Sequence, residues 1–262
     1  MDHEHLSVEQ ILDGLGTECL GRRVLWYQQV DSTSSLARAL AAAGEPEGTV
    51  IVAEEQTAGR GRSGRTWLAA AGTSLLFSII LRPALEAERV QNLTVIAALA
   101  LRDALLSAGA LRAQIKWPND VLLSGRKVAG ALTEMRTIGD RVDFAILGIG
   151  LNVNQQVGAF APALNATSLA IELGYPVDRA SLLQTLLRCL ELRYQRLGSG
   201  QSPITEWAEA LVTLGQRVQL DCGDRSYEGC AEAVDETGAL LVRLDDGQLL
   251  RAPAGDVHTL AP

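Results

Sequence analysis

The chain has 262 residues, of which 47% are hydrophobic and 21% are charged, and its formal net charge is -8. This composition is that of an ordinary globular protein and excludes an intrinsically disordered chain. The acidic charge also argues against nonspecific nucleic-acid binding, which depends on basic side chains that neutralise phosphates. The first twenty residues lack a basic segment followed by an apolar one, and the apolar run over 95–106 contains Arg102 and Asp103. We therefore expect a cytoplasmic protein without a signal peptide or a membrane span.

Hydrophobic periodicity and turn residues predict a mixture of helices and strands over the first 214 residues. A short helix capped by Ser7 is expected first, over 7–16. A strand, a hydroxyl-capped helix and two strands should follow, over 24–30, 32–44, 49–56 and 73–83. A long helix and four strands come next, over 89–108, 114–117, 120–125, 127–136 and 142–153. Two more helices are expected, over 181–197 and 204–214.

The character of the sequence changes near Gly215. Short strands separated by Gly and Asp turns follow, over 217–222, 226–236, 238–244 and 247–253. This pattern predicts a small β-barrel of about fifty residues. We therefore expect an α+β fold with one domain over 1–214 and a second over 215–262.

Residues 59–65 read GRGRSGR and begin with the G-x-G-x-x-G spacing of dinucleotide-binding loops. Such a loop needs a helix directly after it, because the helix N-terminus holds the pyrophosphate. Here a strand is expected instead, and arginines occupy positions 60, 62 and 65. Arginine side chains bind carboxylates and phosphates through paired hydrogen bonds. We interpret the segment as an anion-binding loop that is costly to order when empty and closes on its ligand; a solvated basic hairpin is the alternative.

The chain has 23 basic residues, and only Lys116 and Lys127 among them are lysines. Both lie in the segment KWPNDVLLSGRKVAG, where Pro118 should end a strand and Asn119 with Asp120 should begin a turn. A hairpin would bring the two lysines toward one face. Asn119 and Asp120 are able to coordinate a metal, bind a hydroxyl or accept a proton. An ordinary turn is the alternative.

A third motif, LGIGLNVN, covers residues 147–154. Gly148 and Gly150 permit a ligand to approach the backbone closely, and Asn152 offers an amide. Tight packing between strands explains the same glycines equally well.

The four cysteines show no C-x-x-C spacing, and the three histidines lie away from them in the sequence. We expect reduced, partly buried thiols, with structural zinc or a disulfide as the alternatives.

Together these motifs resemble those of the biotin protein ligases, the enzymes that attach biotin to carboxyl carrier proteins. The family patterns G-R-G-R-x-G-R-x-W, K-W-P-N-D, R-K-x-x-G and G-x-G-x-N are matched in order at 59–67, 116–120, 126–130 and 148–152. The segments D-S-T at 31–33 and T-S-L at 167–169 also match. The likeness extends from about residue 7 to the end of the chain.

The resemblance implies a catalytic domain related in fold to class II aminoacyl-tRNA synthetases, with a mixed sheet flanked by helices, followed by an SH3-like barrel. Some members of the family carry an N-terminal winged-helix domain and act as repressors. Only about thirty residues precede Asp31 in this sequence, which leaves no room for a helix-turn-helix unit. We therefore expect the short form of the enzyme, without DNA binding.

The implied function is that of an ATP-dependent ligase that activates biotin as biotinyl-AMP and transfers it to a lysine of a biotin carboxyl carrier protein. In the family this carrier is usually that of acetyl-CoA carboxylase. Mg²⁺ should accompany ATP, held mainly by phosphate oxygens, and no protein ligand to the metal is assigned. The sequence leaves the oligomeric state open; members of the family often pair through an edge of the central sheet, so a homodimer is one alternative.

By the same resemblance, biotin is bound by Ser32, Thr33, Ser34, Gln56, Gly59, Arg60, Gly61, Arg62, Lys127, Gly130 and Gly148. ATP and the adenylate are bound by Arg62, Arg65, Trp67, Lys116, Asn119, Lys127 and Asn152. The catalytic residues are Arg60, Arg62, Asp120 and Lys127. Arg60 and Lys127 are expected to hold the biotin carboxylate, and Asp120 to orient or deprotonate the incoming lysine.

Three other functions compete with this interpretation. A lipoate or octanoate ligase shares the fold and the adenylate chemistry, but the complete arginine motif argues against it. A biotin-sensing regulator would need a DNA-binding region or a partner. An RNA-binding protein with an arginine loop is disfavoured by the acidic charge and by the low aromatic content of 4%.

Overall fold

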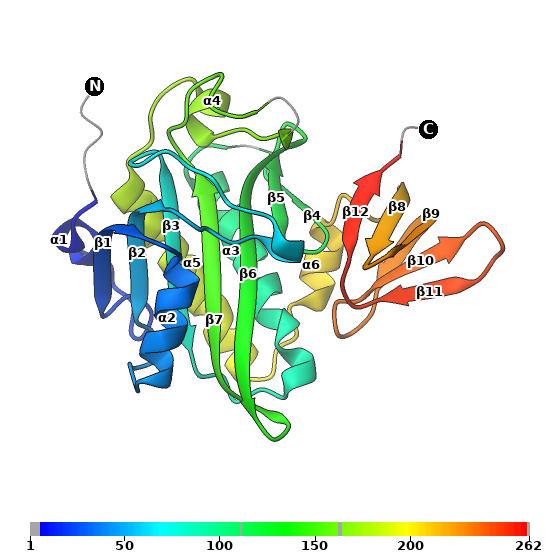
Figure 1. Cartoon of the computed structure of the whole chain (residues 1–262), viewed down its shortest axis with the longest axis horizontal. Helices are drawn as coiled ribbons and strands as arrows, with labels where there is room; N and C mark the ends of the chain where they lie inside the picture. Colours follow the sequence, from blue (N-terminus) through cyan, green and yellow to red (C-terminus); the bar gives the residue numbers. More distant parts are fainter. Residues whose placement is uncertain (1–5, 111, 162–163, 261–262) are drawn as a thin grey trace.

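The protein was analysed as a computed structural model, which describes residues 6–110, 112–161 and 164–260. Within these ranges the α+β fold contains a seven-stranded sheet and a separate five-stranded sheet (Figure 1). The seven-stranded sheet has the order β1-β2-β3-β7-β6-β5-β4. Its strands β1 to β7 cover Val24–Val30, Val50–Gln56, Ser74–Leu81, Gln114–Lys116, Asp120–Leu123, Arg126–Ile138 and Arg141–Asn152. Strands β1 and β2 are parallel and the other neighbours are antiparallel, so the sheet is mixed, as expected.

Helices cover the two faces of this sheet unequally. Helices α3 (Gln91–Ser107) and α5 (Arg179–Gly198) pack behind it, and α2 (Thr33–Ala42) lies in front (Figure 1). Alternate residues of β7 face opposite sides. Leu147 and Ile149 therefore join the large core with α3 and α5, while Phe144 and Ile146 join the small core under α2. Beyond Ile146 on the front face, β7 carries Gly148 and Gly150.

Three short helices complete the larger unit. They are α1, α4 and α6, which cover Val8–Leu12, Leu169–Leu173 and Ile204–Ala210. The expected cap of the first helix is confirmed, because Ser7 and Gln10 form a reciprocal capping box. Helix α4, capped by Ser168, was not expected.

Helix α3 lies within the segment Ala87–Ser107, which by length and hydropathy alone would suit a membrane span. In the described structure 67% of its apolar window is buried inside the protein. Its side chains, such as Leu93, Ile96 and Leu101, belong to the core between the sheet and α5. We therefore interpret α3 as the central core helix of the domain.

The second sheet has the order β11-β10-β9-β8-β12 and is antiparallel. Its strands β8 to β12 cover Arg217–Cys222, Arg225–Val234, Leu240–Leu244, Leu249–Ala252 and Asp256–Thr259. The sequence predicted the first four strands, and β12 was missed. The arrangement of this five-stranded antiparallel sheet agrees with the expected small SH3-like barrel. Since α6 ends at Ala210 and β8 begins at Arg217, we propose that the domains divide at residue 214.

Helix α6 is shorter than the helix expected over 204–214. The periodic pattern continues beyond Ala210, but Leu211 forms a β-bridge with Ile115, and Val212 donates to the Ile115 carbonyl at 2.9 Å. Pairing with β4 thus replaces the last turn of the helix. The reason is tertiary, because β4 is an edge strand whose backbone groups need partners.

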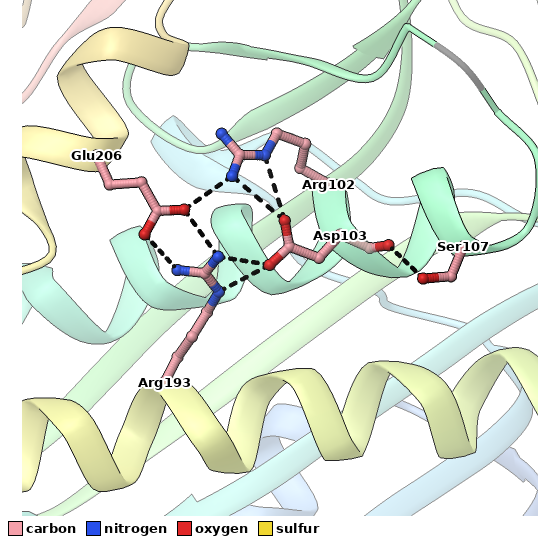
Figure 2. Close-up of polar contacts among 5 residues, drawn as sticks. All are labelled: Arg102, Asp103, Ser107, Arg193 and Glu206. Atoms are coloured by element: carbon pink, nitrogen blue, oxygen red, sulfur yellow. Dashed lines mark hydrogen bonds and ion pairs between the residues drawn. The ribbon is translucent and has the colours of Figure 1, made fainter.

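A cluster of charged side chains fixes α3, α5 and α6 to one another (Figure 2). Arg193 of α5 donates to Asp103 of α3 and to Glu206 of α6. Arg102 of α3 bonds to the same two carboxylates. Each carboxylate is therefore shared by two guanidinium groups, and these hydrogen bonds hold the pKa of Glu206 below its usual value. The cluster therefore holds α6, the helix that precedes the first strand of the second sheet, against α3 and α5.

Candidate active site

A cleft of about 490 Å³ opens on the front face of the larger sheet, a volume typical of small-molecule sites. Its walls come from the start of α2, the segment between β2 and β3, the β4–β5 turn and β12. All the residues assigned to substrates or catalysis from the sequence line this cleft, except Gly59. Gly59 lines an adjacent depression, and a Cβ there would lie 2.6 Å from the Trp67 carbonyl oxygen. In this structure Gly59 allows close backbone packing within the arginine loop, residues 59–67.

Strand register brings distant motifs into one row across the sheet. Lys116 pairs with Asp120, Asp120 with Gly130, and Gly130 with Gly150. The K-W-P-N-D turn and the two glycine-containing strands therefore meet at the same level of the cleft. The expected hairpin with both lysines at one site is confirmed, since Lys116 and Lys127 line the same cleft.

Lys127 lines the cleft beside Asp120 and Trp67. Its Nζ is 2.6 Å from Oδ1 of Asp120 and 5.5 Å from the centroid of the Trp67 ring. The second of these contacts is a cation–π contact. The Asp120 carboxylate is thus the counter-ion of Lys127 in this structure.

A group of hydroxyl and amide side chains forms one end of the cleft. Ser32 is the N-cap of α2, as expected, with its oxygen 3.4 Å from the backbone nitrogen of Ser35. The next residue, Thr33, donates its backbone N–H to Oε1 of Gln56 at 2.8 Å. Ser34 also lines the cleft. Capping by Ser32 therefore does not exclude the predicted ligand contacts, which stay a prediction.

Two glycines of β7 make room for side chains that cross the sheet. A Cβ at Gly148 would lie 2.5 Å from Oγ of Ser34, and a Cβ at Gly150 would lie 2.5 Å from the Trp67 ring. Such distances are shorter than van der Waals contact, so both positions need glycine if these side chains are to stay in place. Gly130 is less restricted, since its nearest neighbours, in Lys127 and Asp120, would lie at 3.4–3.5 Å.

The arginine loop belongs to the segment that connects β2 to β3 along the chain, and this segment crosses in front of the sheet (Figure 1). It contains only a 3-10 turn, η1 (Arg62–Gly64), and no α-helix follows it. The exclusion of a dinucleotide-binding loop is confirmed, because such a loop requires a helix N-terminus at this point.

The three arginines of the loop have different partners. Arg60 ion-pairs with Glu134 of β6 at 2.8 Å. Its guanidinium therefore has to leave the Glu134 carboxylate before it can bind a ligand. Arg62 lies over the Trp117 ring, and its NH2 donates to the carbonyl of Gly255 at 3.1 Å. Arg65 ion-pairs with Asp256 of β12 at 2.8 Å. The loop is therefore tied both to the first sheet and to the second.

Positive charge accumulates beside the Trp67 end of the cleft. Burial lowers the pKa of Lys116, and the nearby charges of Lys127 and Arg65 lower it further, against the opposing effect of Asp120. Burial also lowers the pKa of Arg62. Cations that depress one another's pKa values create a site that gains free energy when an anion arrives.

The two asparagines assigned to the nucleotide are both engaged in internal hydrogen bonds. Asn119 donates to the Ala131 carbonyl at 2.6 Å, and Asn152 donates to the Thr167 carbonyl at 3.0 Å. By contrast, Nε1 of Trp67 is buried without a hydrogen-bond partner among the described residues. A buried donor of this kind in a cleft is a candidate for a ligand contact.

Side-chain clusters suited to a metal ion are absent from the described ranges. These ranges contain no group of three or more His, Cys, Asp or Glu residues that would hold a metal ion. The four cysteines are free thiols, which agrees with the expectation from their spacing.

Comparison with known proteins shows to which family this chain belongs. The model of the Biotin/lipoate A/B protein ligase family matches residues 26–152, and that of the biotin protein ligase C-terminal domain matches residues 213–258. The bifunctional ligase/repressor BirA of Bacillus subtilis is 38% identical over 246 residues, which cover 92% of this chain and 76% of that protein. The chain belongs to the biotin protein ligase family.

Two further relatives support this family membership. The biotin–[acetyl-CoA-carboxylase] ligase of Paracoccus denitrificans is 38% identical over 236 residues, which cover 87% of this chain and 97% of that protein. The biotin protein ligase of Aquifex aeolicus, solved in complex with biotin and ATP, has a TM-score of 0.78 and 28% identity. That comparison covers 91% of this chain and 100% of the other. The fold class expected for a biotin protein ligase is thereby confirmed.

Several residues in or beside the cleft were not assigned to a substrate from the sequence. Gly150 was expected to allow a ligand close to the backbone, but it was not named as a binding residue. Ser78 contacts both Thr33 and Ser34, and a serine flanked on both sides by apolar residues in the strand SLLFSIIL is a signal that sequence reasoning could have used. Asp256 approaches from the second sheet, and nothing in its local sequence indicates the cleft.

Proposed function

We propose that this protein is an ATP-dependent ligase that activates biotin as biotinyl-AMP and transfers it to a lysine of a biotin carboxyl carrier protein. The observation that carries the proposal is the composition of the cleft. Hydroxyl and amide groups line it around the start of α2, and basic side chains, Lys127 among them, line it beside Trp67. This arrangement suits a ligand with a neutral polar head, a carboxylate and an adjoining triphosphate.

The biotin head is assigned to the end formed by α2. Its ureido group offers N–H donors and a carbonyl acceptor, and Ser32, Thr33, Ser34 and Gln56 supply complementary groups there. Gly148 and Gly130 have no side chains, so they leave space for the ligand at the base of this end. The carboxylate tail would then point toward Lys127 and the arginine loop.

The nucleotide is assigned to the end beside Trp67. The indole ring offers a face for adenine, and its buried Nε1 offers a donor. Arg62, Arg65 and Lys116 would bind the phosphates. ATP enters as its magnesium complex, with the ion held mainly by phosphate oxygens.

In the first half-reaction a carboxylate oxygen of biotin attacks the α-phosphorus of ATP, and the bond to pyrophosphate breaks. Two anions have to approach each other, so preorganised cations lower the barrier. Lys127 is placed to interact with both the carboxylate and the α-phosphate. Release of Arg60 from Glu134 would supply a second cation to the carboxylate.

In the second half-reaction the amine of the carrier lysine attacks the carbonyl of biotinyl-AMP, an amide forms, and AMP leaves. The attacking amine has to lose a proton first. Asp120 is the proposed acceptor or orienting group, and its ion pair with Lys127 would place it beside the reacting carbonyl. Closure of the arginine loop would shield the anhydride from water.

The names of the relatives also suggest partners. We propose the carrier domain of an acetyl-CoA carboxylase as the protein substrate, since the relative from Paracoccus denitrificans is named biotin–[acetyl-CoA-carboxylase] ligase. A homodimer through β1 is a second proposal. This seven-residue strand lies at the edge of the described sheet and pairs with one neighbouring strand, β2, so its other side is open to pairing. A cytoplasmic location, with neither DNA nor membrane as partner, remains our prediction.

The first test measures pyrophosphate release from magnesium ATP with biotin, lipoate or octanoate as the acid. We expect release with biotin alone, and a rate roughly 10²–10³ lower in Lys127→Ala, because a cation at the developing charge is lost. Arg89→Ala, which removes one exposed charge outside the cleft, serves as the matched control and should keep full activity.

Release with lipoate or octanoate instead of biotin would refute the substrate while keeping the adenylate chemistry. These acids are included because the matching family model covers both biotin and lipoate ligases. Absence of release with any of the acids would refute the ligase proposal itself.

A further inference from the structure

Ser78 is a fully buried serine in the middle of the apolar strand β3. Its Oγ lies 2.8 Å from Oγ1 of Thr33 and 3.0 Å from Oγ of Ser34. We propose that Ser78 is a positioning residue that fixes the hydrogen-bond direction of the cleft, so that Ser34 presents an acceptor and selects a ligand with a ring N–H. The inference rests on the proposed function and extends it to the specificity for the ureido head.

The direction is set first at Gln56. The backbone N–H of Thr33 is always a donor, and it lies 2.8 Å from the side-chain atom Oε1 of Gln56. This contact requires an oxygen, which settles the orientation of the amide. The Thr33 hydroxyl lies 3.0 Å from the same oxygen. A carbonyl oxygen has no proton, so the Thr33 hydroxyl has to donate.

The remaining protons follow from this one. Each hydroxyl has a single proton and two acceptor positions. Since the Thr33 proton points to Gln56, the contact between Thr33 and Ser78 needs the proton of Ser78. The contact between Ser78 and Ser34 then needs the proton of Ser34. The reverse direction would leave two bare oxygens facing each other at 3.0 Å.

The consequence is a polarised cleft. The proton of Ser34 points inward, so its free lone pair faces the ligand above Gly148. The amide nitrogen of Gln56 has no hydrogen-bond partner among the described residues, so it is available as a donor. An acceptor at Ser34 and a donor at Gln56 match the N–H and the carbonyl of a cyclic urea. Ser78 maintains this polarity without lining the cleft itself.

The test compares biotin with its two cyclic carbamate analogues, in each of which oxygen replaces one ring N–H. In the wild type, the analogue that places oxygen against Ser34 should have a KM roughly 10–100-fold higher, because two acceptors then face each other. In Ser78→Ala the Ser34 hydroxyl is free to rotate and donate to that oxygen. We expect this selectivity to fall at least about fivefold, with kcat for biotin within about twofold of the wild type.

The matched control is Thr94→Val, which removes another buried hydroxyl, bonded to Thr133 at 2.8 Å in the core beneath α3. It should keep the wild-type selectivity even if it lowers thermal stability as much as Ser78→Ala. Equal selectivity in the wild type and Ser78→Ala would overturn the proposal, as would a loss of selectivity in Thr94→Val. Failure of the wild type to use biotin would instead contradict the proposed function, so the two failures are distinguishable.

Discussion

Gly148 and Gly150 lie two residues apart on β7 and face the same side of the sheet. One makes room for Ser34 at the end of the cleft proposed for biotin, and the other makes room for Trp67 at the end proposed for the nucleotide. Neither glycine has a positive φ, so alanine is compatible with the backbone at both positions. Substitutions here therefore test side-chain displacement without adding backbone strain.

We expect Gly148→Ala to raise the KM for biotin and Gly150→Ala to raise the KM for ATP, each by about tenfold or more. The added methyl group would overlap Ser34 or the Trp67 ring, and the displaced side chain would lose its contact with the ligand. The measurement is the pair of KM values for each variant in the pyrophosphate-release assay, and each variant is the control of the other. Equal effects on both substrates would contradict this division of the cleft.

At the scale of elements, the turn between β9 and β10 depends on one carboxylate. Asp235 accepts hydrogen bonds from the backbone and hydroxyl of Thr237 and from the backbone of Ala239, and it ion-pairs with Arg251. Burial by itself would raise its pKa, but the hydrogen bonds from Thr237 and Arg251 lower it to about 2. The folded protein therefore holds this carboxylate ionised more strongly than the unfolded chain does.

Asp235→Asn should reduce the free energy of unfolding by about 2 kcal/mol at neutral pH. Because the folded pKa is lowered, the contribution of Asp235 is complete above about pH 4 and is lost as the pH falls toward 2. Urea unfolding from pH 7 to pH 3 should therefore show the difference from wild type narrowing below about pH 4. The control, Glu236→Gln, changes an exposed carboxylate in the same turn and should have little effect. A constant difference would contradict the electrostatic explanation.

At the scale of the whole molecule, the two sheets share the cleft. Trp117 of the β4–β5 turn donates its indole N–H to the Gly238 carbonyl at 3.0 Å, and Arg62 donates to Gly255. Arg65 ion-pairs with Asp256, whose strand β12 lines the cleft. The small domain therefore supports the arginine loop from outside. Anions in the cleft would compete with Asp256 for Arg65.

Limited proteolysis with trypsin, which cleaves after arginine, reports on the mobility of this loop. We expect biotin with magnesium ATP to slow cleavage at Arg60, Arg62 and Arg65. Without substrates, Asp256→Asn should speed this cleavage by up to about fivefold, since it removes one partly exposed ion pair. Asp224→Asn, in an exposed turn of the same sheet, is the control. Equal rates for both variants, or no protection by substrates, would contradict the closure of the loop on its ligands.

Local sequence chemistry determined most elements and the identity of the site. Periodicity located the helices and strands, because amphipathic faces have to meet a core. Three motifs in order indicated the family, and nearly all the residues named from them line one cleft. Ser7 and Ser32 were recognisable as caps because capping depends on neighbouring residues only.

The remaining features were decided by contacts between distant segments. Helix α6 ends early because Leu211 pairs with Ile115, and Asp256 reaches the arginine loop from another sheet. The counter-ions Glu134 and Asp120 were set by register across β5, β6 and β7. The sequence by itself therefore determined which chemical groups the cleft contains, since residue types are written in the chain. Only the tertiary structure decided which groups face each other, because strand pairing and packing join residues that are far apart in sequence.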